Sequence, residues 1–144
     1  LFVHRFKGYW KDVGTVDSLW EANMDLIEMM DEDFYAGDKH YFRLFSEDTN
    51  SVPQYIGKKA KVTNSVVNQG AIILGTVDGS IISNEVFIEV GAVVKDSVIM
   101  PGVTVGRNAF INKAIVANDL IVPDDMQINV AGEKVLLVHE GVVK

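Results

Sequence analysis

Three histidines are the residues of this chain best suited to acid–base chemistry at neutral pH. They stand at positions His4, His40 and His139, and histidine titrates in the range that catalytic proton transfer requires. Cysteine is absent, so the sequence offers neither thiolate chemistry nor disulfides. It contains no G-x-G-x-x-G or Walker-type spacing to cradle phosphates. Any chemical role therefore depends on where the histidines and carboxylates are placed.

One carboxylate stands in an unusual setting, the segment YWKDVGT from Tyr9 to Thr15. From the residues alone, Asp12 reads as a solvated turn residue next to Gly14, and the two aromatic residues read as core beside a turn. The preceding run, Leu1 to Phe6, reads as a short strand.

The residues from Thr15 to Met30 have the pattern of a helix. Thr15 can serve as the N-cap and Asp17 lies in the first turn. The apolar residues repeat at helical spacing and form one face, consisting of Leu19, Ala22, Leu26 and Met30 with Trp20 and Ile27 beside them. An apolar face of this size requires a partner. Tyr41, Phe42, Leu44 and Phe45 form a possible extended segment farther along.

From Ile56 to Ile128 the aliphatic residues follow a six-residue beat. Three successive lines of 17 residues, starting at Ser80, Ser97 and Ala114, align in columns such as Ile82, Ile99 and Val116. A strand of a few residues plus a corner takes about six residues, and three such sides close one coil. The pattern predicts a mainly β fold, a left-handed parallel β-helix of hexapeptide repeats.

Irregularities and outward residues can also be predicted from this register. The line from Ser65 to Gly79 has only 15 residues, so the first turn should be irregular, and Met126 replaces the small residue found at the other corners. Val135 to Val138 and Val142 to Val143 should form a strand or hairpin that closes the last coil. The apolar neighbours of the inward columns should point outward and could form an association surface: Val66, Ile72, Ile81, Phe87, Val93, Val98, Phe110 and Ile115.

Composition excludes several classes of function. The net charge of −7 argues against nucleic acid or an anionic membrane as the main partner, because both demand a basic face. The apolar runs are far short of a membrane span, and no signal peptide is recognisable. We therefore expect a cytoplasmic protein.

The segment Gly8 to Leu26, GYWKDVGTVDSLWEANMDL, closely resembles the end of the nucleotidyltransferase domain of bacterial glucose-1-phosphate adenylyltransferases, the ADP-glucose pyrophosphorylases. Val52 to Ile56 and Val93 to Gly106 resemble the β-helix domain of the same family. The resemblance implies an enzyme of glycogen biosynthesis that converts ATP and glucose 1-phosphate into ADP-glucose and pyrophosphate. It also implies that residues 1–31 are the strand, turn and helix that end an α/β nucleotidyltransferase domain, 32–55 a linker and 56–144 the β-helix domain.

The resemblance further implies site residues. Asp12 would help to hold the Mg²⁺ that bridges the phosphates, together with an acidic ligand upstream of this chain. Tyr9 and Trp10 would shape the sugar-phosphate pocket. The family's Gly-rich loop and its sugar-phosphate lysine have no counterpart here. We therefore read the chain as the carboxyl-terminal part of a longer protein and expect it to be inactive alone.

Assembly and control then become the expected roles of the β-helix. The family resemblance implies a tetramer, homomeric or mixed with a related subunit, and sugar-phosphate or nucleotide effectors. Cationic candidates for binding such effectors are Lys95, Arg107, Lys113 and His139. Asn118 stands where some family members have an arginine, which puts an effector site of that kind in doubt. Two alternatives stay open, namely the oligomerisation domain of a non-catalytic sister subunit and a hexapeptide-repeat acyltransferase, for which no histidine lies inside a regular coil.

Overall fold

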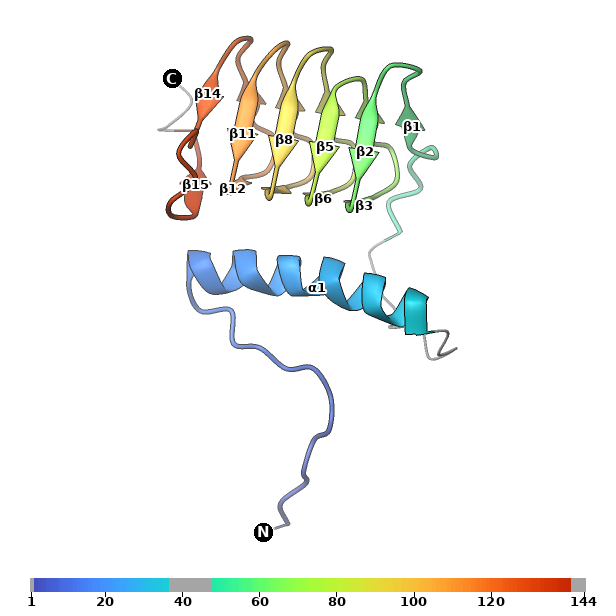
Figure 1. Cartoon of the computed structure of the whole chain (residues 1–144), viewed down its shortest axis with the longest axis vertical. Coiled ribbons are helices and arrows are strands. Elements are labelled where there is room, and N and C mark those ends of the chain that lie inside the picture. Colours follow the sequence, from blue (N-terminus) through green and yellow to red (C-terminus); the bar gives the residue numbers. More distant parts are fainter. Residues whose placement is uncertain (1, 37–47, 141–144) are drawn as a thin grey trace.

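The computed structural model describes residues 2–36 and 48–140, with the backbone alone at 31–36. Its larger part is a parallel β-helix with three flat sides, each a five-stranded parallel sheet, and one long helix lies along it (Figure 1). The sheets are named here by their strands. Sheet A contains β1 (Tyr55–Ile56), β4 (Ile72–Ile73), β7 (Phe87–Ile88), β10 (Thr104–Val105) and β13 (Ile121–Val122).

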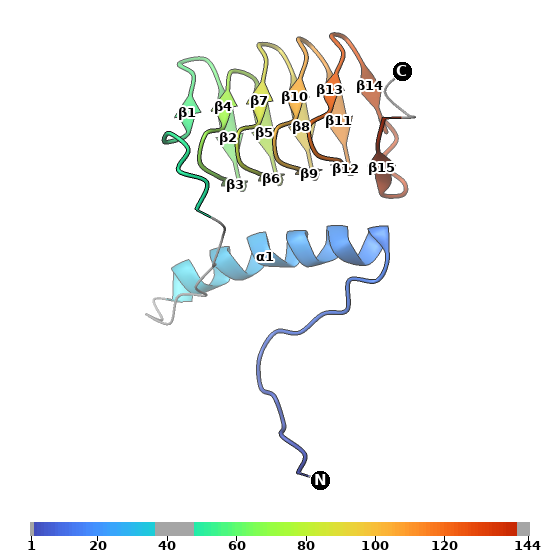
Figure 2. The same ribbon diagram turned by 180° about the vertical axis from the view of Figure 1, so that it is seen from behind.

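The other two sides have the same construction. Sheet B contains β2 (Lys61–Thr63), β5 (Thr76–Asp78), β8 (Val93–Lys95), β11 (Phe110–Asn112) and β14 (Gln127–Ile128). Sheet C contains β3 (Val66–Val67), β6 (Ile81–Ile82), β9 (Val98–Ile99), β12 (Ala114–Val116) and β15 (Leu136–Val138). Successive coils add one strand to each sheet, as Figure 2 shows from behind.

The predicted columns are the register of the sheets. Ile99 lies between Ile82 and Val116 in sheet C, and the same arrangement holds for the columns of the other two sides. The side chains of these columns point inward and fill the coils, most of them with no exposed surface. Burial of one such aliphatic side chain stabilises the fold by about 1.5–3 kcal/mol. Because one coil encloses too little apolar surface, the stack of coils is the folding unit.

The line from Ser65 to Gly79 is shortened at one corner of the second coil, and not in the first turn as predicted. Only Leu74 and Gly75 connect β4 to β5, whereas four residues connect β7 to β8. A Cβ atom at Gly75 would lie 2.4 Å from the carbonyl oxygen of Ala92 in the next coil. The short corner is therefore possible only because position 75 has no side chain.

A column of serines satisfies the backbone at the corner between sheets B and C. The N–H groups of Ser80, Ser97 and Ala114 donate to the hydroxyl oxygen of Ser65, Ser80 and Ser97, respectively, at 3.0–3.1 Å. Each serine hydroxyl in turn donates to the carbonyl two residues before it. Ser80 and Ser97 are fully buried, so these bonds replace water for groups that water cannot reach.

Ser97→Ala is expected to destabilise the β-helix by about 1–3 kcal/mol, because it leaves the buried N–H of Ala114 without its acceptor. Urea unfolding followed by far-UV circular dichroism measures this loss. Ser83→Ala is the control, since Ser83 is half-buried at the protein surface, where water can replace its hydroxyl. Equal midpoints for the two variants would contradict this role of the serine column.

The helix α1 (Val16–Ala36) begins as the sequence predicts. The Thr15 hydroxyl accepts a hydrogen bond from the N–H of Ser18 at 3.1 Å, and the Ser18 hydroxyl accepts one from the N–H of Thr15 at 3.0 Å. Two N–H groups that the first turn would leave unpaired are thus satisfied reciprocally. The helix continues six residues beyond the predicted end at Met30, because the acidic run that follows contains no glycine before Gly37.

The apolar face of α1 packs on the outer face of sheet C (Figures 1 and 2). Ile27 is 7% exposed and forms a second apolar cluster with Ile81, Val98 and Ile115, bordered by Trp20, Met24, Leu26, Val66 and others. The helix axis follows the stacking direction, so successive turns meet successive coils. The outward direction of these aliphatic residues is as predicted, but on sheet C the partner is the chain's own helix.

One sequence prediction is wrong and others are untested. Residues 2–6 form no strand, since no strand lies beside them in the described part of the chain and an unpaired strand lacks its hydrogen bonds. The closing strand is confirmed, because β15 pairs in parallel with β12. The possible extended segment at 41–45 and the pair Val142–Val143 lie outside the described residues, and the division into domains stays a prediction.

Candidate functional site

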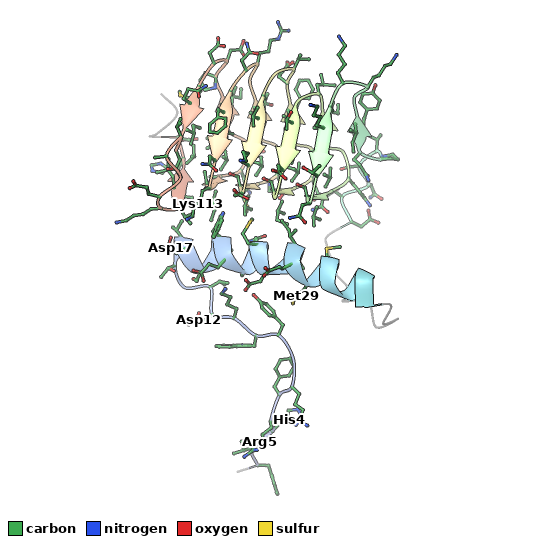
Figure 3. All side chains as sticks on the ribbon, in the orientation of Figure 1. His4, Arg5, Asp12, Asp17, Met29 and Lys113 are labelled. Atoms are coloured by element: carbon green, nitrogen blue, oxygen red, sulfur yellow. The ribbon has the colours of Figure 1, made fainter. Side chains whose placement is uncertain are left out.

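The segment of Tyr9 to Asp12 lies against α1 on the side away from the β-helix (Figure 3). One carboxylate oxygen, Oδ2 of Asp25, accepts hydrogen bonds from the Tyr9 hydroxyl at 2.9 Å and from Nζ of Lys11 at 2.8 Å. The Lys11 ammonium also lies 3.2 Å from a carboxylate oxygen of Glu21. Since 21 and 25 are one helical turn apart, both acids meet the same lysine.

These contacts shift three ionisation equilibria. Hydrogen bonds from Lys11 and then from Tyr9 lower the pKa of Asp25 below its usual 3.8. The hydrogen bond to Asp25 is the largest cause that raises the pKa of Lys11 above 10.5. Partial desolvation, followed by the hydrogen bond to Asp25, raises the pKa of Tyr9 above 10.0. All three shifts favour the protonation states that keep the segment on the helix near neutral pH.

Attachment of this segment should be constant at neutral pH and weaken at both extremes. A lowered pKa for Asp25 means that its contribution is complete above pH 3.8 and is lost as the pH falls further. The raised pKa values of Tyr9 and Lys11 mean that the contribution of these two groups is complete below about pH 10 and is lost at higher pH. The Tyr9 ring proton shifts in NMR spectra measure this, and an acid step that persists unchanged in Asp25→Asn would contradict the assignment.

Asp12 is exposed and is labelled in Figure 3 below the first turns of α1. Among the residues that the structure describes, no group of three or more histidine, aspartate or glutamate side chains could hold a metal ion. A single exposed carboxylate fits Mg²⁺ as one ligand, because this ion keeps several waters and uses one or two carboxylates together with substrate oxygens. The donor set is therefore compatible with Mg²⁺ only if further ligands come from outside these residues.

The two aromatic candidates differ in their surroundings. Trp10 is 76% exposed, whereas Tyr9 is 42% exposed and its hydroxyl is engaged by Asp25. Sequence reasoning missed Asp25 and Glu21. No sequence pattern links their positions to the YWKDVGT segment. Their acidic side chains on the polar side of the helix read as ordinary solvated charges.

On the opposite side, α1 is fixed to the β-helix by a tryptophan. The indole N–H of Trp20 donates to the carbonyl oxygen of Asp96 at 2.6 Å, and Nζ of Lys113 lies 5.4 Å from the centre of the Trp20 ring. A cation over an indole face is attracted by about 0.5–1 kcal/mol at an exposed site. Asp96 and Lys113 are corner residues of successive coils with positive φ, 44° and 47°. Trp20 therefore contacts two successive corner residues of the β-helix directly.

Two grooves flank α1 where it meets sheet C. One, of about 300 Å³, is lined by Trp20, Met24, Ile27, Glu28, Asn64 and Asp96. The other, of about 430 Å³, is lined by Leu19, Leu26 and apolar residues of sheet C together with the amide side chains of Asn23, Asn68 and Asn84. Neither groove is lined by Asp12, Tyr9 or Trp10.

The four cationic candidates do not form one site. Lys95 and Lys113 share the corner between sheets B and C, where the N–H of Lys113 donates to the carbonyl of Lys95 at 3.1 Å. Arg107 lies at a different corner, 3.8 Å from a carboxylate oxygen of Glu89. His139 follows β15 at the end of the stack. Asn118 is exposed just beyond β12.

The histidines do not form an acyl-transfer site in the described coils. His4 lies in the exposed segment before α1, His139 follows the last strand, and His40 is outside the described residues. No histidine lies between two neighbouring coils in the described part of the β-helix.

No helix among the described residues has the length and apolar character needed to cross a membrane.

The β-helix also matches a known family. A family model described as GlmU-like, C-terminal hexapeptide, matches residues 49–135. The chain belongs to this family. The match begins just before β1 and ends just before β15, so the GlmU-like hexapeptide region is the stack of coils described above.

Sequence relatives extend beyond this hexapeptide region and include α1 and the segment before it. The chain is 44% identical to the glucose-1-phosphate adenylyltransferases of Bacillus mycoides (strain KBAB4) and Bacillus anthracis, and 43% identical to that of Bacillus cereus (strain Q1). Each alignment covers 98% of this chain and 38% of the relative, in its carboxyl-terminal part. The chain thus spans well under half the length of the curated relatives it matches, and the predicted resemblance is confirmed.

Proposed function

We propose that the chain is the carboxyl-terminal part of a glucose-1-phosphate adenylyltransferase, which forms ADP-glucose and pyrophosphate from ATP and glucose 1-phosphate in glycogen biosynthesis. The observation that carries this proposal is the 44% identity over 98% of the chain, which includes the YWKDVGT segment as well as the hexapeptide coils. Hexapeptide coils alone would fit several reactions. The protein that holds this chain together with its upstream catalytic residues is called the full-length protein below, and we propose a cytoplasmic location for it.

In the proposed reaction a phosphate oxygen of glucose 1-phosphate attacks the α-phosphorus of ATP, and the bond from that phosphorus to the oxygen that bridges the α- and β-phosphates breaks, so that this oxygen leaves as a terminal oxygen of pyrophosphate. When bound, Mg²⁺ supplies neutralisation of the charge on the phosphates. Asp12 is the residue of this chain that would hold it, and its exposed carboxylate is free of the Asp25 network. We propose that Trp10 and Tyr9 shape the sugar-phosphate pocket next to it.

Assembly and regulation are proposed as the roles of the β-helix. The outer face of sheet A carries a column of mostly apolar side chains that Thr104 interrupts, and its exposed members are Tyr55 (58%), Ile72 (39%) and Ile121 (71%). Such a face supports association with other subunits into a tetramer, homomeric or mixed. For sugar-phosphate or nucleotide effectors, Lys95 and Lys113 are the favoured cations because they share a corner, whereas Arg107 and His139 lie apart from them.

The product formed by the full-length protein tests the proposal. Incubation with Mg²⁺, glucose 1-phosphate and either ATP or UTP, followed by chromatography of the sugar nucleotides, is expected to give ADP-glucose and pyrophosphate. The 144-residue chain under the same conditions is expected to give none. Formation of UDP-glucose alone, or no sugar nucleotide, would reject the adenylyltransferase assignment.

A non-catalytic sister subunit is the second candidate. It is favoured only by the location of the chemistry outside this chain and disfavoured by the complete YWKDVGT segment. A full-length protein that makes no ADP-glucose but raises the activity of a catalytic partner would identify it. Acetyl transfer from acetyl-CoA serves as the assay for the acyltransferase reading, and the placement of the described histidines predicts that none occurs.

A further inference from the structure

The contacts of α1 divide the side chains of the YWKDVGT segment into two groups. Tyr9 and Lys11 are bonded to Asp25, and they are two residues apart. Trp10, which is 76% exposed, and the exposed Asp12 belong to the other group. A single carboxylate on the helix therefore determines which side of the segment faces outward.

The helix that carries this carboxylate is itself fixed. Ile27 is buried against Ile81, Val98 and Ile115 of sheet C, and the Trp20 indole bonds to the Asp96 carbonyl. The position of the segment before α1 relative to the β-helix is thus set through α1. Rotation of α1 about its axis would move Asp25 and the two side chains bonded to it.

Asp25 contributes orientation more than stability. The Lys11 and Asp25 side chains are 27% and 34% exposed, and ion pairs open to water typically contribute at most about 1 kcal/mol. Oδ2 of Asp25 nevertheless accepts hydrogen bonds from both Tyr9 and Lys11. Together these two bonds fix how the segment is rotated about its own axis. A device of this kind changes the placement of neighbouring groups without changing whether the protein folds.

We propose that Asp25 is a positioning residue of the nucleotidyltransferase site: by holding Tyr9 and Lys11 on α1, it presents Trp10 and Asp12 to the metal and sugar phosphate. This inference rests on the proposed function, since it assigns a purpose to the outward side chains. Tyr9 then contributes through the hydrogen bond of its hydroxyl to Asp25. Glu21, one helical turn earlier, also holds Lys11, with 3.2 Å between its carboxylate oxygen and the Lys11 ammonium.

Steady-state kinetics of the full-length protein test the proposal through Asp25→Asn. This variant is expected to need about tenfold more Mg²⁺ for half-maximal rate, the lower end of the effect of removing a residue that orients a metal ligand, with an unchanged thermal midpoint. In a Tyr9→Phe, Lys11→Met background, Asp25→Asn should add almost nothing, because its partners are already absent. Glu28→Gln, an exposed acid on the same helix, is the control and should leave the Mg²⁺ requirement unchanged.

A measurement independent of activity separates this inference from the proposed function. In protein labelled with 5-fluorotryptophan, the ¹⁹F resonance of Trp10, identified by its loss in Trp10→Phe, should narrow and shift in Asp25→Asn while that of Trp20 stays in place. An unchanged Trp10 resonance, a normal Mg²⁺ requirement, or an additive effect in the double background would each overturn the positioning role. A wild-type protein without ADP-glucose synthesis but with the expected ¹⁹F change would instead reject the proposed function and leave Asp25 as the anchor of the segment.

Discussion

Asp12→Asn in the full-length protein is expected to slow ADP-glucose formation by about 10²- to 10³-fold. The substitution keeps the size of the side chain and removes the negative charge that would hold Mg²⁺. A metal ion on transferring phosphates is worth several kcal/mol of transition-state stabilisation, and each 1.36 kcal/mol corresponds to a factor of ten. Because Asp12 is exposed and lies apart from the apolar cores, the thermal midpoint should not change.

Asp17→Asn is the matched control for this experiment. Asp17 is an exposed carboxylate only five positions away, in the first turn of α1 (Figure 3), and its loss should leave the rate within about a factor of two, as expected for a surface substitution. Initial rates at saturating ATP and glucose 1-phosphate over a range of Mg²⁺ concentrations provide the comparison. If the two variants were equally active, Asp12 would be the solvated turn residue that its local sequence suggests.

Ile27→Asp is expected to detach α1 from the β-helix. The substitution places an unpaired carboxylate among Ile81, Val98 and Ile115, at a cost of roughly 3–5 kcal/mol. Most of the stability of a helix in a protein comes from the packing of its apolar face, so the Trp20 contacts with Asp96 and Lys113 are not expected to hold α1 in place by themselves. Its amides should therefore exchange with deuterium at least about a hundredfold faster, whereas amides of β8, β9 and β11 should keep their protection.

Met30→Asp controls for the introduction of a charge into the same helix. Met30 is 41% exposed, so a carboxylate there remains hydrated and α1 should stay protected. Hydrogen exchange followed by mass spectrometry resolves the helix from the coils. Simultaneous loss of protection in α1 and in the coils would show that the two unfold together, and loss in neither would show that the sheet C contact is not what holds the helix.

The β-helix could be predicted from sequence because its pattern of aliphatic residues is local and repeats in every coil. Each coil places an aliphatic residue where the previous coil has one, so Ile82, Ile99 and Val116 align without knowledge of the structure. The N-cap at Thr15 was predictable for the same reason, since the bond to Ser18 spans three residues. The serine column stands at the start of successive lines, but the sequence does not predict its hydrogen bonds, because serine at a corner usually signals a turn rather than a buried ladder.

The partner of α1 could not be predicted because sequence does not distinguish outward residues that meet a helix from those that meet water. Ile81 and Ile72 occupy equivalent outward positions, yet the first is 7% and the second 39% exposed. The contact between Trp20 and Asp96 joins residues 76 positions apart, and no periodicity links them. Residues 2–6 show the opposite failure, since their strand-like composition forms no strand when the described part of the chain offers them no neighbouring strand.

The candidate site was predictable only through its resemblance to a family. Asp12 in isolation has the character of a turn residue, and the two grooves beside α1 do not include it. What the structure adds is the Asp25 network, which depends on α1 and the segment before it folding back on each other. The local pattern of neither element contains that information.

The most direct test of this account is an experimental structure of the full-length protein with Mg²⁺ and ADP-glucose. We predict that an Asp12 oxygen binds the metal at about 2.0–2.1 Å or through one of its waters, with Tyr9 and Lys11 still bonded to Asp25 and α1 on sheet C. A structure in which Asp12 contacts neither the metal nor its waters, while α1 keeps its place, would contradict it.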